Sequence, residues 1–386
     1  MAMGAVNDVT EEALRDLAQI RAREQTVLSL YLDLDPAWFA TAPARATEID
    51  SLLDGAHREV EAGERPHRER QELRRALTRA REVLEEDRSW AHGAHAVALF
   101  LCEALALSRL LRLPHPVSAA WVIADVPFIA PLAESGPVGR VCVALVDERF
   151  ARILRGSAGA LREVISFGDP VPGRHKQGGW SQARYQRWQY EGAEAHLRRA
   201  ARMLHDLLRV SPYDSLLIAC TAPLWPRVAA KLHADVRERL HSDRLSLDVG
   251  DASVEDVLRA AAPALAAQQR AREDVALAEL RERHGRDGDG RAAVGLEAVL
   301  DALVQRRVAA LLYDARLRLA GVVCARCGWM GADGDRCPLD GTALQERASI
   351  LEDAVHSAVT QSAEVMALRD RPELGPLGGV AATLRF

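Results

Sequence analysis

VCVALVDERFARILRGSAGALREVISFG, residues 141–168, is the stretch that decides the fold of the middle of the chain. It contains three apolar segments, residues 141–147, 151–156 and 161–168, separated by short turns rich in Gly and charged residues. Short apolar segments between turn residues predict three β-strands in a meander. A helical pattern over residues 182–209 and a further apolar segment follow. This order of elements predicts a small α/β domain.

Regular patterns of apolar residues also flank this stretch. Thr10 precedes acidic residues and a helical pattern, which predicts a helix over 9–25 with Thr10 as its N-cap. The alternation in TVLSLYLDLDP predicts a half-buried strand over 26–36. The same criteria predict two helices within 44–88, helices near 224–240, 253–283 and 348–361, and a helix, turn and strand over 295–314. They also predict strands over 94–102, 215–220 and 244–249, and within 121–132 a short strand that leads into a loop marked by proline.

We expect three α/β domains in series. ESGPVG (134–139) combines Gly and Pro, which interrupt regular structure, and marks a linker. The expected parts are an N-terminal α/β domain (1–135), a ribonuclease-H-like central domain (138–270) and an α/β C-terminal domain (271–386) with a cysteine-rich insert at 322–343.

The overall composition is that of a globular protein with no net attraction for nucleic acid. The 386 residues are 48% hydrophobic and carry a formal net charge of −5, so contact with RNA requires a local basic patch. No run of about 18 uncharged apolar residues occurs, which predicts that no segment spans a membrane. The acidic start lacks the apolar core of a signal peptide, so we expect a cytoplasmic protein. Cys102, Cys142 and Cys220 stand alone in apolar surroundings and are expected in the core.

The other three cysteines form the pattern CARCGWMGADGDRCPLDG. Cys324 and Cys327 make one CxxC pair, and Cys337 is followed, at the place of a fourth cysteine, by Asp340. Paired knuckles of this kind bind one tetrahedral zinc ion, and a carboxylate is an acceptable zinc ligand. We therefore predict a zinc-ribbon-like insert with structural zinc as its cofactor. The alternative is a degenerate ribbon that folds without metal.

The segment GRHKQGGWSQARYQR (173–187) is a basic loop at the start of the predicted long helix. From Arg174 to Arg202 the chain has seven Lys or Arg and two Glu, a charge distribution typical of phosphate binding. The Gly178-Gly179 pair lets the backbone come close to a ligand. An exposed hinge whose arginines only solvate the helix would have the same composition. The residues expected to contact RNA are Arg174, His175, Lys176, Gln177, Trp180, Arg184, Tyr185 and Arg187.

Two motifs resemble the archaeal and eukaryotic class I peptide release factors. The glycine pair followed by Arg184, Tyr185 and Arg187 resembles the Gly-Gly-Gln loop of their central domain, which enters the ribosomal peptidyl transferase centre. The segment GLEAVLDALVQRRVAALLY resembles the start of their third domain, which carries a CxxC…CxxC mini-domain in archaeal members. The resemblance covers residues 138–386. SLYLDLDP and LGGVAATLRF are more similar to the bacterial and archaeal branch of this superfamily, near Pelota and Balon.

This resemblance implies a protein that acts on the ribosome, with rRNA and tRNA as partners and an elongation-type GTPase as a further one. In a catalytic loop, Gly178 and Gly179 present backbone N–H groups to the developing oxyanion of the peptidyl-tRNA ester, and Gln182 orders a water. The first 135 residues contain neither the Asn-Ile-Lys-Ser-type loop nor the Tyr-x-Cys motif of stop-codon reading. We therefore expect hydrolysis that is independent of the stop codon, in rescue or quality control.

The loop also allows a second hypothesis. When Arg184 and Tyr185 are aligned with the family, Trp180 stands at the position of the glutamine, and Gln182 comes two residues later. The protein would then occupy the ribosomal A site without hydrolysis, as a hibernation or stalling factor of the Balon or Pelota kind.

A remote third hypothesis is a metal-dependent nuclease. Asp125, Asp147 and Asp214 each stand at the edge of a predicted strand. Carboxylates that meet at one edge of a ribonuclease-H-like sheet bind Mg²⁺.

Overall fold

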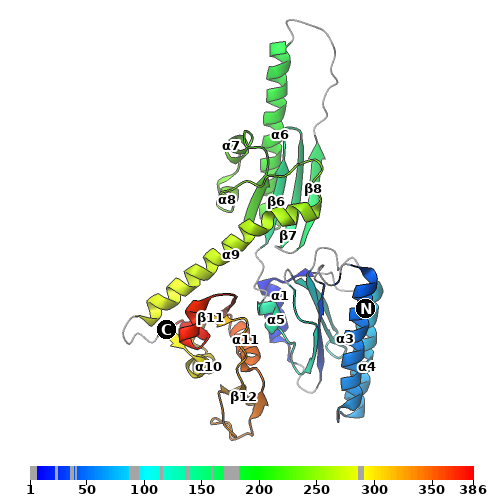
Figure 1. Cartoon of the computed structure of the whole chain (residues 1–386), viewed down its shortest axis with the longest axis vertical. Coiled ribbons are helices and arrows are strands. Elements are labelled where there is room, and N and C mark those ends of the chain that lie inside the picture. The colour runs from blue at the N-terminus through cyan, green and yellow to red at the C-terminus, as the bar shows by residue number, and fades with distance from the viewer. Residues whose placement is uncertain are drawn as a thin grey trace. The chain divides into compact units, whose positions relative to one another are not determined.

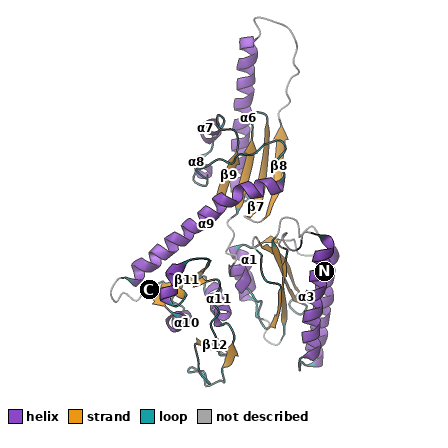
Figure 2. Cartoon of the chain, viewed as in Figure 1, coloured by secondary structure: helices purple, strands orange, loops and turns teal. Residues whose placement is uncertain are grey.

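In a computed structural model the chain forms a mixed α/β protein, as the sequence predicts (Figures 1 and 2). The structure describes residues 7–21, 25–34, 39, 41–86, 95–113, 116–134, 140–157, 160–168, 182–285 and 291–386. By their contacts the residues fall into two compact units, Val138–Gln268 on the one hand and Met1–Pro137 with Gln269–Phe386 on the other. Within the described part of the chain, every helix is too short or too polar to span a membrane.

The unit Val138–Gln268 is built on a four-stranded sheet with the order β8-β7-β6-β9. β6 (Val141–Val146), β7 (Phe150–Ser157) and β8 (Ala160–Gly168) form the predicted antiparallel meander, and β9 (Ser215–Ala219) lies parallel to β6. The domain thus has an antiparallel meander, then a helix, then a fourth strand that lies parallel to the first. This order agrees with the ribonuclease-H-like arrangement that we expected.

Both faces of this sheet are buried, because side chains alternate along each strand. One face packs against α6 (Gln182–Val210) and the other against the first half of α9 (Val254–His284). Along β6 the α6 face receives Cys142, Ala144 and Val146, and the α9 face receives Val141, Val143 and Leu145. A strand that is buried on both faces has apolar residues at every position, which explains the sequence VCVALV.

The connection between β9 and α9 departs from the prediction. Two short helices, α7 (Trp225–Ala229) and α8 (Ala234–Arg237), replace the single helix expected there. The strand predicted over 244–249 is wrong, since Leu245 alone forms a bridge, to Ala219. Its N–H donates one hydrogen bond of 2.8 Å to a β9 carbonyl, and a single bond makes no ladder.

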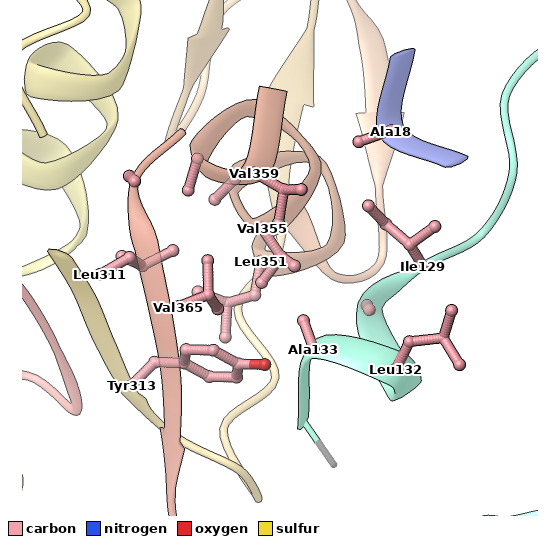
Figure 3. Close-up of a cluster of buried hydrophobic side chains, with 14 of the residues drawn as sticks. Ala18, Ile129, Leu132, Ala133, Leu311, Tyr313, Leu351, Val355, Val359 and Val365 are labelled. Atoms are coloured by element: carbon pink, nitrogen blue, oxygen red, sulfur yellow. The ribbon is translucent and has the colours of Figure 1, made fainter. Parts of the chain in front are cut away.

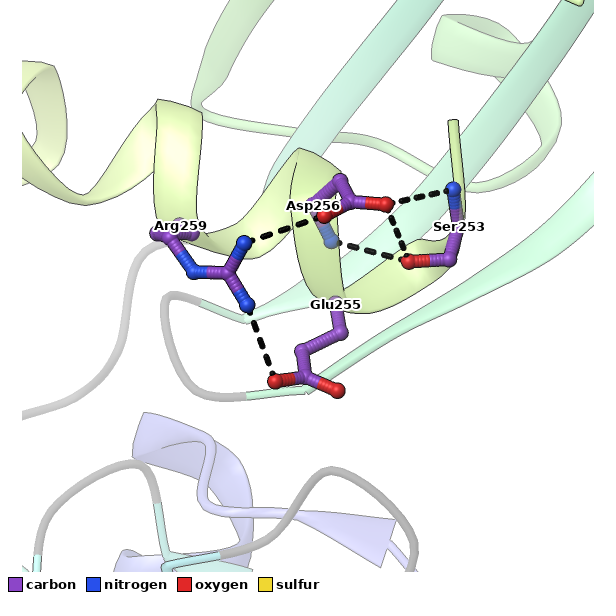
Figure 4. Close-up of polar contacts among 4 residues, drawn as sticks. All are labelled: Ser253, Glu255, Asp256 and Arg259. Atoms are coloured by element: carbon purple, nitrogen blue, oxygen red, sulfur yellow. Dashed lines mark hydrogen bonds and ion pairs between the residues drawn. The ribbon is translucent and has the colours of Figure 1, made fainter. Parts of the chain in front are cut away.

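α9 begins with a capping box (Figure 4). Ser253 Oγ accepts a hydrogen bond of 3.1 Å from the N–H of Asp256, and the Asp256 carboxylate accepts from the N–H and hydroxyl of Ser253 at 3.1 and 2.6 Å. Arg259 donates to Asp256 and Glu255, each at 3.0 Å. These bonds satisfy polar groups that a helix leaves unpaired at its start, so Ser253 sets where α9 begins.

The N-terminal part of the other unit contains a five-stranded sheet with the order β1-β4-β3-β2-β5. Its central strands β2 (Val27–Asp33) and β3 (Ala96–Cys102) pack one face against helices α3 (Ala42–Ala62) and α4 (His67–Glu86). Thr10 caps α1 as predicted, because its Oγ1 accepts the N–H of Ala13 at 3.1 Å. The remaining elements are β1 (Asn7–Asp8), α1 (Glu11–Gln19), β4 (Leu107–Leu113), β5 (Ala120–Ala124) and α5 (Ala130–Glu134).

The C-terminal part of this unit contains a second, four-stranded sheet with the order β10-β16-β11-β15. Helices α10 (Leu296–Val304) and α11 (Ile350–Thr360) cover one face, and Leu277 and Leu280 near the end of α9 pack on the other. The strands are β10 (Ala292–Val294), β11 (Val308–Asp314), β15 (Glu364–Leu368) and β16 (Val380–Leu384), with the 3₁₀ turn η2 (Pro372–Leu377) before β16.

The two ends of the chain share one hydrophobic core in this unit (Figure 3). Ala18 of α1, Ile129 and Leu132 belong to the same buried cluster as Leu351 and Val359 of α11. Burial of a leucine side chain stabilises a protein by about 1.5–3 kcal/mol. This cluster therefore holds the N-terminal and C-terminal parts of the unit together.

The three isolated cysteines lie in the core, as predicted. Cys102, Cys142 and Cys220 are buried. Burial raises the pKa of the Cys142 thiol to about 12, which leaves it protonated and unreactive at neutral pH.

Candidate functional site

The predicted catalytic loop connects β8 to α6. β8 ends at Gly168, and Gln182 is the first residue of α6. Arg184, Tyr185 and Arg187 belong to the first turns of the same helix. The roles of all these residues stay predictions. Arg174, His175, Lys176, Gln177, Gly178, Gly179 and Trp180 lie outside the described residues.

α6 extends beyond the end of its sheet (Figure 1). Among the α6 side chains that the structure describes, the first to be buried is Ala193, eleven residues after Gln182. At 1.5 Å per residue, roughly 16 Å of helix separates these two positions. From Ala193 onward the helix packs on the sheet through Leu197, Leu204 and Leu208. Gln182 therefore begins a helix whose packing on the sheet is described from Ala193 onward.

Two exposed arginines add positive charge to the packed part of α6. Arg198 and Arg202 are four residues apart and share one face of the helix. Within the described part of the chain neither has an ion-pair partner. Arg199, by contrast, lies over the ring of Phe167, with its Cζ 4.4 Å from the ring centroid. Arg198 and Arg202 thus place two exposed positive charges on one face of α6.

A cluster of charged residues links α6 to the segment after β9. The Glu194 carboxylate contacts Lys231 Nζ at 2.5 Å and accepts from Arg227 at 3.2 Å. Arg227 also pairs with Glu148 at 2.7 Å and lies over the ring of Tyr190. The hydrogen bonds from Lys231 and then Arg227 hold the pKa of Glu194 below its ordinary value. Sequence analysis missed this cluster because its members are far apart in the chain and form no motif.

The cysteine-rich insert forms two matching turns beside a small sheet. β12 (Gly321–Val323) pairs with β13 (Met330–Gly331) and β14 (Gln345–Arg347). In the first turn the N–H of Gly328 donates to the carbonyl of Cys324 at 2.9 Å, and in the second the N–H of Gly341 donates to that of Cys337, also at 2.9 Å. Gly328 and Gly341 have φ of 76° and 73°, a conformation that favours glycine.

The structure brings Cys324, Cys327, Cys337 and Asp340 together. One ligand atom from each lies within 4.8 Å of the other three. Cys327 Sγ is 3.4 Å from Cys337 Sγ, and Cys324 Sγ is 3.6 Å from each carboxylate oxygen of Asp340. Zn–S bonds of about 2.3 Å in a tetrahedral site place two sulfur atoms about 3.8 Å apart. The four side chains therefore form a donor set of the size that a zinc ion requires.

Hydrogen bonds prepare part of this donor set for a cation. The backbone N–H and side chain of Thr342 donate to Asp340 and lower its pKa to about 2. Desolvation opposes ionisation of Cys324, but hydrogen bonds from the backbone of Cys327 and Arg326 outweigh it and lower the pKa of that thiol. Desolvation raises the pKa of Cys327 to about 12. A metal must displace the Cys327 proton, so metal binding weakens as the pH falls.

Residues 127–266 match the family described as Bacterial archaeo-eukaryotic release factor family 10. This part of the chain is similar to a family of the release-factor superfamily. The matched range contains the whole sheet β8-β7-β6-β9 and α6, so the family model covers the sheet and the helix that follows the predicted loop. The resemblance that the Gly-Gly loop suggested is confirmed at this level. No curated protein matches the chain.

Several solved structures are similar to the chain at low identity. The archaeal translation termination factor aRF1 is 17% identical over 98% of this chain and 99% of that one, with a TM-score of 0.28. Archaeoglobus fulgidus Pelota is 14% identical over 70% and 77%, with a TM-score of 0.33. S. cerevisiae Dom34, a translation termination-like factor involved in RNA quality control pathways and interacting with Hbs1, is 10% identical over 75% and 79%, with a TM-score of 0.39.

The aspartates of the nuclease hypothesis do not form one site. Asp147 follows the last residue of β6 and accepts the N–H groups of Arg149 and Phe150 at 2.6 and 2.5 Å. Asp214 precedes β9 and pairs with Arg140, which precedes β6. Because β6 and β9 are parallel, the two carboxylates lie at opposite ends of the sheet, about 20 Å apart. Asp125 belongs to the other compact unit. The nuclease hypothesis is therefore wrong for these residues.

Proposed function

We propose that this protein binds the ribosome and that its release-factor domain hydrolyses the peptidyl-tRNA ester without reading a stop codon. The observation that carries the proposal is the family match over residues 127–266, which includes the Gly-Gly loop and α6. The projection of α6 beyond its sheet supports it, because a narrow projecting helix suits a loop that must enter a confined site.

The chemistry follows from the residue types in the loop. Gly178 and Gly179 have no side chains, so their N–H groups can approach the oxyanion that forms when water attacks the ester. Gln182 orders that water through its amide. A preorganised donor of this kind lowers the barrier by about 3–4 kcal/mol. The ribosome and the terminal ribose of the tRNA supply the remaining groups.

Contacts to RNA phosphates hold the loop in place in this proposal. The loop cations Arg174 and Lys176 and the helix cations Arg198 and Arg202 lie on both sides of Gln182 in the sequence. Phosphate contacts of this type position a protein on RNA without reading sequence. They agree with a factor that acts independently of the codon in the ribosome.

A second candidate function is supported by Trp180. The family's glutamine position carries an indole here, which fills space and stacks on bases but does not order a hydrolytic water. In this case the protein occupies the A site as a hibernation or stalling factor. Both functions place the protein in the cytoplasm, and both allow an elongation-type GTPase as a delivery partner.

One assay separates the two functions. Ribosomes that carry labelled peptidyl-tRNA, with no stop codon in the A site, are mixed with the protein, and both co-sedimentation and release of peptide are measured. Hydrolysis by the loop predicts release that falls about 100-fold or more in Gln182→Ala, since one oriented donor is lost. Gln186→Ala, on the same helix, is the matched control and keeps full release.

Binding without release identifies the second function. No binding at physiological salt overturns both. Release that survives in Gln182→Ala and in Gly179→Ala removes the catalytic assignment.

We further propose that zinc occupies the donor set of Cys324, Cys327, Cys337 and Asp340 in a structural role. The set has three thiols and one carboxylate and no open position, as structural sites do. The ion would hold the two glycine turns of the insert together. We also propose that the chain consists of three domains, residues 1–135, 138–270 and 271–386.

A further inference from the structure

A second group of metal-binding side chains lies in the unit Val138–Gln268. It contains His205 on α6, His233 immediately before α8, and Asp235 in α8. One ligand atom from each residue lies within 4.8 Å of the other two. The three side chains come from two elements that are separated in the sequence by β9. We propose that His205, His233 and Asp235 bind a Zn²⁺ ion that links α6 to α8.

The geometry places the three donors close to the spacing that the ion requires. The imidazole rings of His205 and His233 are stacked with centroids 4.2 Å apart and planes at 29°. His233 Nδ1 is 3.5 Å from a carboxylate oxygen of Asp235. Ligands of a tetrahedral zinc ion, at bonds of about 2.1 Å, are about 3.4 Å apart. The His233–Asp235 pair already has this spacing. The other pairs lie within 4.8 Å and must shorten by up to about 1.4 Å, as the imidazole rings rotate out of their stack.

The charges and exposure around the site also permit an ion. Arg237, in the same short helix as Asp235, donates to the carbonyl oxygens of Ala229 and Leu232. Its guanidinium therefore satisfies backbone groups and leaves the Asp235 carboxylate to the histidines. His233 and Asp235 are 54% and 58% exposed, so an ion reaches them from solvent without opening the core.

The donor chemistry selects the class of metal. Two imidazole nitrogens and one carboxylate oxygen suit Zn²⁺ and related transition-metal dications and are a poor set for Ca²⁺ or Mg²⁺, which prefer oxygen. Three protein ligands leave one coordination position for solvent or an external donor. Because the residues meet only in the folded unit, an ion bound there stabilises the fold.

Metal binding to the full chain tests the proposal. Zinc-free protein is titrated with Zn²⁺, and separately with Co²⁺ as a spectroscopic replacement. We expect the histidine site to bind one equivalent of Co²⁺ without thiolate-to-cobalt charge-transfer absorption. Any Co²⁺ bound by the cysteines is separate and does give this absorption. His205→Gln and His233→Gln lose the thiolate-free equivalent. His284→Gln, which removes an exposed histidine at the end of α9, retains it.

Thermal unfolding provides a second readout. Zn²⁺ at 100 times its dissociation constant raises the unfolding midpoint of this unit by about 5–15 °C in the wild type, and this rise disappears in His205→Gln. If a histidine variant does not fold, Asp235→Asn keeps the shape of the site and removes its charge. A thiolate-free equivalent that persists in both histidine variants, or half-saturation only at millimolar Zn²⁺, overturns the proposal and leaves an adventitious ion only. Loss of the cysteine site changes the total in every variant equally and does not affect the comparison.

Discussion

Replacement of Glu194 by glutamine removes the charge that links α6 to Lys231 and Arg227. Glu194 and Lys231 are only 15% and 20% exposed, so this network is more shielded than an ordinary surface ion pair. A surface pair contributes about 0–1 kcal/mol, whereas a charged hydrogen bond in a shielded place contributes about 1.5–3 kcal/mol. We expect Glu194→Gln to lower the free energy of unfolding by about 1–2 kcal/mol, between these limits.

A double-mutant cycle isolates the pair. Urea unfolding of the wild type, Glu194→Gln, Lys231→Met and the double variant should give a coupling energy of about 1 kcal/mol. Glu191→Gln is the matched control, because Glu191 is exposed on the same helix and has no ion-pair partner among the described residues. A coupling energy below about 0.3 kcal/mol, or equal effects of the Glu191 and Glu194 variants, refutes the reasoning.

The coupling also depends on pH in a defined direction. Lys231 and then Arg227 lower the pKa of Glu194 from its ordinary value of 4.5, so the folded state favours the charged form. The stabilisation is complete above that ordinary value and is lost as the pH falls through the lowered one. The cycle repeated at pH 7 and in acid should therefore show coupling only at pH 7.

Three further outcomes are expected. Cys337→Ser should weaken the thiolate-to-cobalt absorption of the insert, because one of three sulfur ligands is lost, while the far-UV circular dichroism changes little, because the core lies elsewhere; an unchanged absorption would contradict the zinc assignment. Arg198→Gln with Arg202→Gln should weaken ribosome binding and reduce the slope of log K against log salt by about 1.4–1.8, as expected for two lost phosphate contacts; an unchanged slope would exclude these contacts. Burial, with a smaller effect of Arg21, lowers the pKa of His356 from 6.5 to about 4, so the unfolded state binds the proton first and stability falls as the pH drops from 6.5. His356→Gln should remove about 1–3 kcal/mol of the difference in unfolding free energy between pH 7 and pH 4.5, and an unaltered pH dependence would show that burial does not lower the pKa of His356.

The sequence predicts those helices and strands that depend only on neighbouring residues. The N-cap at Thr10 and the meander over 141–168 require only neighbouring residues, and both are confirmed. β4 was missed because Arg109 and Arg112 interrupt its apolar pattern, LSRLLRL, although the strand lies between β1 and β3. β4 is a strand because β1 and β3 pair with it on both sides, and β1 is too far away in the sequence to appear in a short window around β4.

The candidate sites divide in the same way. Cys324, Cys327, Cys337 and Asp340 lie within 17 residues, so the spacing alone predicts their meeting. Glu194 and Lys231, or His205 and His233, meet only because α6 and the segment after β9 pack on the same face of one sheet. Ala18 and Val359 share a core from opposite ends of the chain. Such contacts depend on the complete topology, and residue type gives no sign of them.

The start of α6 offers a direct test of which residue acts in the loop. Gln182 is the first residue of the helix, so its backbone is held by α6, while Trp180 and Ser181 precede the helix in the sequence. Deletion of Trp180 and Ser181 places Gln182 directly after Gly179 and restores the family's Gly-Gly-Gln order. It also shortens the connection from Gly168 by up to about 7 Å. If the longer loop is adapted to Gln182, the deletion should lower peptide release at least 10-fold with unchanged ribosome binding. If instead the deletion creates or increases release, the natural loop is an anchor centred on Trp180, and hydrolysis is not its function.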